Sequence, residues 1–205
     1  MIKVGINRSL WLFGVVQLIS ILGFAALSSD SHVQPIVDQR PIRDLSILPP
    51  DAAPYLLDST RRSEEDILLR PVDLNTASLE TLAALPPIAE AEDPEALAQS
   101  IIDARPLRTG ADHPLFTEDL DWHVTVQTNV NTASKSELTA HALLSETDVE
   151  AIVSARSEGL LTDLSGLSLP DDFAPLAAFR IDPNTATPSE LALLPGLMAA
   201  VRRRR

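Results

Sequence analysis

Asn131-Thr132-Ala133-Ser134 is the stretch that decides the fold, because the chain repeats it twice more with small changes. The other copies are Asn75-Thr76-Ala77-Ser78 and Asn184-Thr185-Ala186-Thr187, and a leucine follows each asparagine seven residues later. A repeat at such a near-regular interval indicates that the chain is built from copies of one small unit. The sequence therefore predicts three related units, the third of them short.

Each unit is expected to be a helix, a tight turn and a second helix. Ser134 with Glu137, and Thr187 with Glu190, have the spacing of a capping box, in which a hydroxyl and a carboxylate bind free N–H groups at a helix start. The first copy has only Ser78 as its cap. The turn follows ten residues after each asparagine, and a second helical run closes copies one and two.

Apolar residues at matching positions predict one core shared by the units. Residues at helical spacing form a packed stripe when they recur in register. The residues expected in this shared core are Leu82, Leu138, Leu191, Ile101, Ile102, Ile152 and Val153.

At these motifs the chain resembles the helix-hairpin-helix repeats of the ComEA-type competence DNA receptors. Units of that family run from Asn-Thr-Ala-Ser through Leu-Pro-Gly-Ile-Gly to a helix that ends in arginine. The same module occurs in the type II secretion minor pseudopilin K and in the PsbU subunit of photosystem II. The resemblance covers residues 72–205 and implies an all-α fold of tandem helix-hairpin-helix units. It implies less about function, because one fold hosts several roles.

Residues 1–28 are expected to form an N-terminal transmembrane helix. Residues 10–27 carry no charged side chain, and a run of this length reaches the lower end of what spans a bilayer. Lys3 and Arg8 precede the run, which predicts a single pass through the cytoplasmic membrane with the N-terminus inside. A signal peptide cleaved near Ser28 is the alternative. Both interpretations place the repeats outside the cytoplasm, as a periplasmic domain.

The rest of the chain divides into four segments. Residues 29–70 are rich in proline and charge and are interpreted as a tether, with docking of short apolar islands on the repeats as the alternative. Residues 71–125 form unit 1 with acidic insertions, 126–180 form unit 2, and 181–205 form a truncated unit 3 with an arginine tail.

Charge and turn chemistry limit where nucleic acid can bind. In DNA-binding units of this family, a glycine-rich turn brings backbone N–H groups close to a phosphate. Copies one and two have Pro87 and Leu143 in place of that glycine. Unit 1 has 11 acidic and 2 basic residues, a net charge of −9, and unit 2 has a net charge of −5. A phosphate or DNA contact is therefore expected only at Gly196, Leu197, Arg202, Arg203, Arg204 and Arg205.

No catalytic, cofactor-binding or metal-binding residues are predicted. The chain lacks cysteine, and its four histidines do not have the spacing of zinc ligands. An acidic stretch from Asp112-His113 to His123 could hold a cation, but it is more simply a polar connection that covers the helices. His141 stands where the family has a turn leucine, which predicts a partly buried histidine at a helix end.

Two functions remain open from the sequence. The first is a non-enzymatic interaction or assembly module that binds a protein partner in an envelope complex, favoured by the acidic units and lost glycines. The alternative is a ComEA-like receptor that binds double-stranded DNA weakly, through the third hairpin and its arginine tail.

Overall fold

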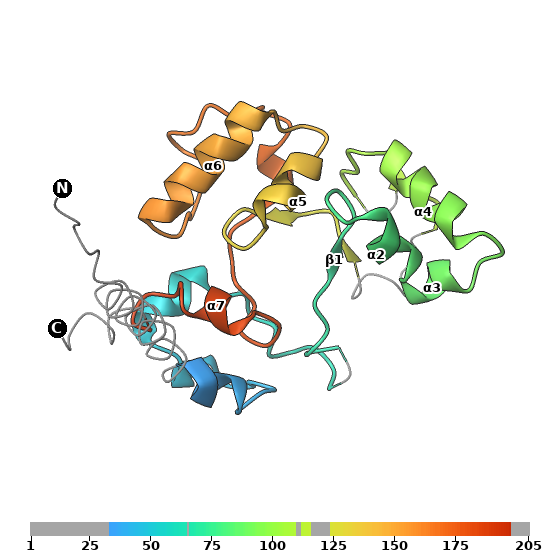
Figure 1. The fold of residues 1–205 in the computed structure, drawn as a ribbon. Helices are drawn as coiled ribbons and strands as arrows, with labels where there is room; N and C mark the ends of the chain where they lie inside the picture. Colours follow the sequence, from blue (N-terminus) through green and yellow to red (C-terminus); the bar gives the residue numbers. More distant parts are fainter. Residues whose placement is uncertain (1–32, 65, 110–111, 116–123, 198–205) are drawn as a thin grey trace, which may run out of the picture.

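The computed structural model describes residues 33–64, 66–109, 112–115 and 124–197, and these residues form short helices joined by turns and very short strands (Figure 1). The α-helices are α2 (Leu79–Ala83), α3 (Pro86–Ala89), α4 (Pro94–Asp103), α5 (Lys135–Ala140), α6 (Glu146–Glu158) and α7 (Pro188–Leu191). Residues 33–37 are also helical. The 3-10 helices are η1 (Leu45–Ile47), η2 (Pro50–Tyr55) and η5 (Ala174–Leu176). The strands are β1 (Val72–Asp73), β2 (Val124–Thr125), β3 (Thr128–Asn129) and β4 (Ala177–Ala178).

The prediction of an all-α fold is wrong, because the described residues contain two small sheets beside the helices. Strand β1 pairs with β2, and β3 pairs with β4, in both cases in parallel. The fold is therefore mixed α/β. Each strand is two residues long, which is too short for the alternation of apolar and polar residues that reveals a strand in a sequence.

The expected transmembrane helix has no counterpart in the described structure. Residues 10–27, on which that prediction rested, lie outside the described residues. None of the helices that the structure does describe is long and apolar enough to cross a membrane. The prediction of a single-pass membrane protein with its repeats outside the membrane is corrected accordingly.

The backbone at the start of each repeat pairs in parallel with a second segment of the chain. The paired positions are Val72 with Val124, Thr128 with Ala177, and Ile181 with Leu56. The first member of each pair stands three residues before the asparagine of its repeat, so the three pairings are equivalent. In repeats 1 and 2 the partner strand comes from the end of the same repeat. In repeat 3 it comes from the N-terminal part of the chain.

The second half of repeat 3 is formed by residues 33–59, which we call the N-terminal half-repeat. Its apolar residues are buried together with those of residues 181–194. In Figure 1 this segment, in blue and cyan, lies beside α7, in red, at the opposite end of the colour scale. The structure therefore differs from the extended tether expected for residues 29–70 and agrees with the alternative, since Leu48 and Leu56 are buried against the third copy.

Three separate cores replace the single shared core that the sequence predicts. Leu82 and Ile101 pack in the core of repeat 1, Leu138 and Ile152 in that of repeat 2, and Leu191 in that of repeat 3. All five are fully buried, as expected. Ile102 and Val153 are only partly buried at the edges of the first two cores. Because the two strands of each sheet belong to one repeat, repeats 1 and 2 bury their apolar residues without help from a neighbour, whereas repeat 3 uses the N-terminal half-repeat.

The predicted helix starts are confirmed. In repeat 2 the Ser134 hydroxyl accepts the N–H of Glu137, and the Glu137 carboxylate accepts the N–H of Ser134. Thr187 and Glu190 form the same capping box in repeat 3. In repeat 1 the Ser78 side chain caps α2 alone. These caps fix the first helix of every repeat directly after its Asn-Thr-Ala turn.

Candidate functional site

The repeated asparagine joins the two halves of its repeat. Asn75 accepts a hydrogen bond from the N–H of Leu107 at 2.8 Å and donates to the carbonyls of Leu107 and Val126, both at 2.8 Å. Asn131 makes the same three bonds with Leu161 and Phe179. A buried side-chain amide has to satisfy its donors and acceptor within the protein. The asparagine is therefore a structural residue in these repeats.

Asn184 makes the equivalent contacts with the N-terminal half-repeat. Its side chain accepts the N–H of Ile42 at 2.6 Å and donates to the Ile42 carbonyl and to the Ser59 hydroxyl, at 3.2 and 3.0 Å. Ile42 thus takes the place that Leu107 has in repeat 1. The third repeat is complete in its hydrogen bonding although its halves lie far apart in sequence.

In each repeat, an arginine side chain also binds two backbone carbonyls at the Asn-Thr-Ala turn. Arg105 donates to the carbonyls of Leu74 and Ala77, at 2.7 and 2.6 Å. Arg156 does the same in repeat 2 and Arg40 in repeat 3. Burial lowers the pKa of all three guanidinium groups from the ordinary arginine value. These arginines contact backbone carbonyls inside the repeats and so stabilise the Asn-Thr-Ala turns.

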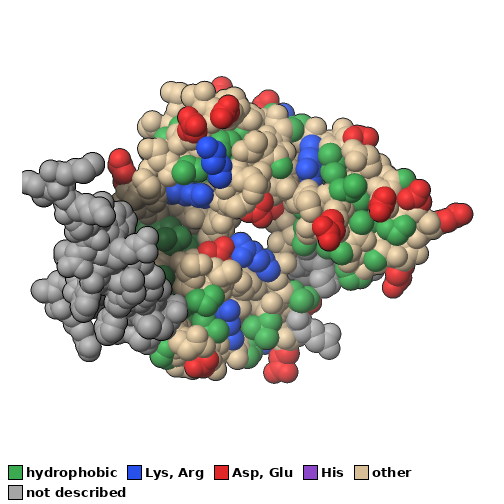
Figure 2. Space-filling model, in the orientation of Figure 1, with side chains coloured by type: hydrophobic (Ala, Val, Ile, Leu, Met, Phe, Trp, Pro, Cys, Tyr) green, Lys and Arg blue, Asp and Glu red, His purple; other side chains and the backbone are tan. Residues whose placement is uncertain are grey.

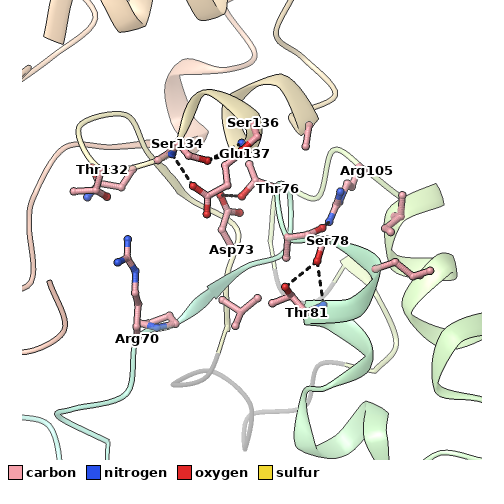
Figure 3. A pocket seen from close by; sticks show the side chains of 18 residues that line it. Arg70, Asp73, Thr76, Ser78, Thr81, Arg105, Thr132, Ser134, Ser136 and Glu137 are labelled. Atoms are coloured by element: carbon pink, nitrogen blue, oxygen red, sulfur yellow. Dashed lines mark hydrogen bonds between the residues drawn. The ribbon is translucent and has the colours of Figure 1, made fainter. Parts of the chain in front are cut away.

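Two open hollows lie where the repeats meet. The first hollow, of about 750 Å³, lies between repeats 1 and 2. Figure 3 shows hydroxyl side chains of both repeats around it, among them Thr76, Ser78 and Ser134. The central hollow, of about 690 Å³, is lined by all three repeats and by the N-terminal half-repeat. Thr132 lines both hollows, so they are neighbours.

Arg70 also lines both hollows and crosses between parts of the chain. It precedes β1 of repeat 1, yet its guanidinium forms a two-pronged ion pair with Glu190 of repeat 3, at 2.8 and 3.1 Å. Nearby, Arg62 pairs with Asp182 at 3.1 Å. Figure 2 shows basic and acidic side chains together around the middle of the visible face. The hollows therefore contain both charges, with exposed apolar residues beside them.

The predicted DNA contact at the third hairpin is occupied in part by the protein itself. Gly196 has a φ of +85°, and a Cβ atom at this position would lie 2.5 Å from the Cβ of Pro49. The close approach that glycine permits is therefore used by Pro49 of the N-terminal half-repeat. Leu197 packs at the edge of the repeat 3 core, and its N–H donates to the Leu194 carbonyl. Arg202, Arg203, Arg204 and Arg205 lie outside the described residues.

His141 is more buried than predicted. It is 1% exposed, and its ring meets Phe173 edge to face with centroids 5.0 Å apart. Its Nδ1 accepts the N–H of Leu143 at 3.3 Å, whereas Nε2 is buried without a partner among the described residues. Burial lowers the pKa of His141; the Asp73 charge raises it and the Arg105 charge lowers it, by smaller amounts. The imidazole is therefore held neutral in a position that equivalent repeats fill with leucine.

The acidic stretch that could hold a cation is described only in part. Asp112 caps its own turn, accepting the N–H groups of Arg108 and Thr109 at 2.6 and 2.8 Å. His113 is 7% exposed and lies 3.2 Å from the Ser100 hydroxyl. Glu118, Asp119, Asp121 and His123 lie outside the described residues. Among the residues that the structure describes, no three potential ligands form a metal-binding group.

Comparison with known proteins adds little to the geometry. No model of a known protein family matches the chain, and no solved structure matches it. Among curated proteins, an "Uncharacterized protein" of Haemophilus influenzae is 56% identical over 32 residues, which is 16% of this chain and 8% of that protein. The chain therefore spans a small part of this relative's length, and the relative's name indicates no activity.

The sequence contains a signal for the N-terminal half-repeat that the Asn-Thr-Ala motif does not reveal. Residues 36–42 read Ile-Val-Asp-Gln-Arg-Pro-Ile, and residues 101–107 read Ile-Ile-Asp-Ala-Arg-Pro-Leu. Both contain the arginine that binds the turn and, two residues later, the residue that pairs with the asparagine. The Asn-Thr-Ala motif belongs to the first half of a repeat, so it does not mark a second half that stands alone in the sequence.

Proposed function

We propose that this chain is a non-enzymatic helix-hairpin-helix repeat protein that binds a protein partner at the central hollow, and so acts as an interaction module of a larger complex. The observation that carries the proposal is the lining of the central hollow. It combines Leu57, which is 36% exposed, with the charged pairs Arg62–Asp182 and Arg70–Glu190. Exposed apolar residues rimmed by polar ones are typical of protein-binding surfaces.

Two further exposed leucines directly precede Arg70, a residue that lines this hollow. Leu68 and Leu69, 49% and 37% exposed, directly precede Arg70. Large apolar side chains in water are unfavourable, and an extended partner segment could cover them while its polar groups meet Arg70 and Thr132. The mixed lining suits a polypeptide, which carries apolar and polar groups at short intervals, better than a uniformly charged polymer.

Two observations weigh against duplex DNA as the main partner. Gly196, the one glycine in the three hairpin turns, is packed against Pro49. Repeats 1 and 2 carry net charges of −9 and −5, which repel a polyanion. Arg40, Arg105 and Arg156 are bound to backbone carbonyls, and Arg62 and Arg70 are paired with carboxylates, so these five arginines are not free to bind phosphates.

Site-specific photo-cross-linking tests the proposal. A photoreactive amino acid replaces Thr162, an exposed residue on the wall of the central hollow, or, as a matched control, Thr139, an exposed residue of α5 that lines neither hollow. We expect a discrete protein adduct from position 162 in extracts of the source cells, absent from position 139 and lost when Leu57→Arg is added. Identical adducts from both positions would contradict the proposal.

Duplex binding across a salt series tests the alternative. The full chain is compared with a version that ends at Val201 and so lacks the four terminal arginines. We expect weak binding that falls steeply with salt and disappears with the arginines. Submicromolar binding near physiological salt that survives their removal would replace the interaction module with a DNA receptor.

A further inference from the structure

The charged side chains of the central hollow differ in how far they reach the solvent. Those that line the hollow are Arg62, Arg70, Arg180, Asp182 and Glu190. The side chains of Asp182 and Glu190 are only 8% and 12% exposed, whereas that of Arg70 is 50% exposed. The hollow therefore presents basic groups to the solvent more than acidic ones.

Both carboxylates of the hollow are also occupied by donors from the protein itself. Asp182 accepts hydrogen bonds from the guanidinium of Arg62 and the hydroxyl of Ser59, at 3.1 and 2.6 Å, and one from a backbone N–H. Glu190 accepts two from Arg70 and another from a backbone N–H. A carboxylate with these partners has little capacity left for a ligand. Neither acidic side chain is therefore suited to bind a cation in the hollow.

Arg180 is the basic residue of this hollow whose charge is not neutralised by a neighbour. The residue is exposed, and within the described part of the chain its guanidinium forms no ion pair and no hydrogen bond. Only its backbone carbonyl is engaged, by the side chain of Asn129 at 2.6 Å. The chain as a whole has a net charge of −13, so an unpaired guanidinium here opposes the charge of the rest of the molecule. Its complement is an anionic group on a partner.

Apolar side chains and hydroxyl groups surround these arginines. Tyr55, Leu57 and Phe179 line the same hollow and are each at least partly exposed. Thr132 and Thr185 line it too, and their hydroxyls bind none of the residues that the structure describes. Figure 3 shows the Arg70 side chain extending toward Thr132. The hollow thus offers hydroxyl donors beside its basic groups.

The two threonines occupy the same position of the repeated Asn-Thr-Ala motif in repeats 2 and 3. The other positions of the motif have structural roles, because the asparagine joins the halves of its repeat, the alanine is buried and the next residue caps a helix. The threonine hydroxyl has no such role in these two repeats. It is therefore free to donate a hydrogen bond to a bound segment.

Given a protein partner at the central hollow, as proposed above, we infer that the bound segment carries an aspartate or glutamate whose carboxylate pairs with Arg180. Apolar residues beside that carboxylate cover Leu57 and Phe179, and Thr132 and Thr185 donate to oxygens of the segment. A nucleic acid fits less well, because its charges are evenly spaced. It would bring phosphates close to the acidic repeats and leave the apolar lining in water.

Binding of short peptides to the full chain tests this inference. Three fluorescent peptides have the same leucines and differ only in the residues between them, which are aspartate, glutamine or lysine. We expect the aspartate peptide to bind about tenfold more tightly than the glutamine peptide, and the lysine peptide to bind most weakly. The advantage of the aspartate peptide should shrink as salt is added, since salt screens exposed charges.

Substitutions of Arg180 locate the preference. Arg180→Gln should weaken binding of the aspartate peptide about tenfold and leave the glutamine peptide unchanged, and Arg180→Glu should favour the lysine peptide. Arg61→Gln is the matched control, because it makes the same change in net charge at an exposed arginine that lines neither hollow. We expect it to leave the order of the three peptides unchanged.

Several results would overturn the inference. They are equal binding of all three peptides, no binding of the aspartate peptide at about 1 mM, or the same loss from Arg61→Gln as from Arg180→Gln. A duplex DNA probe that binds through Arg180 more tightly than the aspartate peptide would replace the acidic segment with a nucleic acid. The proposed function is tested separately, because the photo-cross-link from position 162 reports a protein partner of any charge. An adduct that persists in Arg180→Gln would leave that function in place and contradict the acidic segment.

Discussion

The guanidinium of Arg40 donates a hydrogen bond to the backbone carbonyl of Pro183 at 2.9 Å, although 143 positions separate the two residues. A second bond from the same group reaches the carbonyl of Ala186. These two bonds attach the N-terminal half-repeat to the Asn-Thr-Ala turn of repeat 3, as Arg105 attaches the two halves of repeat 1.

We therefore expect Arg40→Ala to destabilise repeat 3. The substitution leaves two carbonyls without a donor, and an unsatisfied buried polar group costs about 1–3 kcal/mol. Urea unfolding measures the loss, and Arg61→Ala, which removes an exposed arginine just after the N-terminal half-repeat, is expected to change the unfolding free energy by less than about 0.5 kcal/mol. Equal effects from both substitutions would show that the contact contributes nothing.

The core of repeat 2 is expected to be sensitive to the loss of Leu138. This side chain is fully buried with Ile152 and Phe173, and truncation of a buried leucine to alanine costs about 2–5 kcal/mol. Leu68→Ala is the matched control, because Leu68 is 49% exposed. Thermal unfolding of the two variants should differ clearly; similar melting temperatures would mean that Leu138 is not a core residue.

Stability should fall as the pH drops, in part because of His141. Burial lowers the pKa of this histidine in the folded chain, so below the ordinary histidine value near 6.5 the unfolded chain binds the proton more readily. Above that pH the neutral His141 ring makes its full contribution to the free energy of unfolding, and this contribution is lost as the pH falls below it. His141→Leu removes this loss and the unpartnered Nε2 atom.

Urea unfolding at pH 7.5 and pH 5.0 tests this expectation. The variant should lose less stability than the native chain between the two values. His113, whose pKa burial also lowers, stays in both proteins and cancels in the comparison. An equal loss in both would exclude His141 as the source.

Gly196→Ala should be more harmful than Gly166→Ala. Both glycines have positive φ values, +85° and +88°, in which alanine is strained by roughly 1–2 kcal/mol. Only at position 196 does a new Cβ also meet another residue, at 2.5 Å from the Cβ of Pro49; nothing lies within 4 Å at position 166. The extra loss in unfolding free energy should shrink when Pro49→Gly is added. No such recovery would show that the clash is relieved in another way.

The repeat motif was a good guide to the parts of the fold that depend on neighbouring residues. Ser134 and Glu137 are three positions apart, and a capping box needs nothing else, so its place was predictable. Leu82, Leu138 and Leu191 recur with the motif and are all buried. The prediction that these leucines share one core was wrong. The spacing of a residue indicates that it is buried, but it does not indicate which neighbours it packs against.

Contacts between distant segments could not be predicted in the same way. The strand pair Val72 and Val124 joins positions 52 apart, and two residues carry no periodic pattern. The hollows depend on how three repeats are arranged, which the motif within one repeat does not contain. Gly196 was predicted to contact phosphate because Pro49, the residue that packs against it, lies far away in the sequence.

Because its two halves are far apart in the sequence, repeat 3 can complete its core only late in translation. Val33 to Leu56 leave the ribosome before repeats 1 and 2, whereas their buried partners Leu191 and Leu194 leave it after both. Repeats 1 and 2 contain both of their halves in sequence and can fold during synthesis. The N-terminal half-repeat must remain exposed during that time, because domains fold from the N-terminus only as their contacts become available. During translation this apolar segment is therefore exposed to water for longer than the apolar residues of repeats 1 and 2.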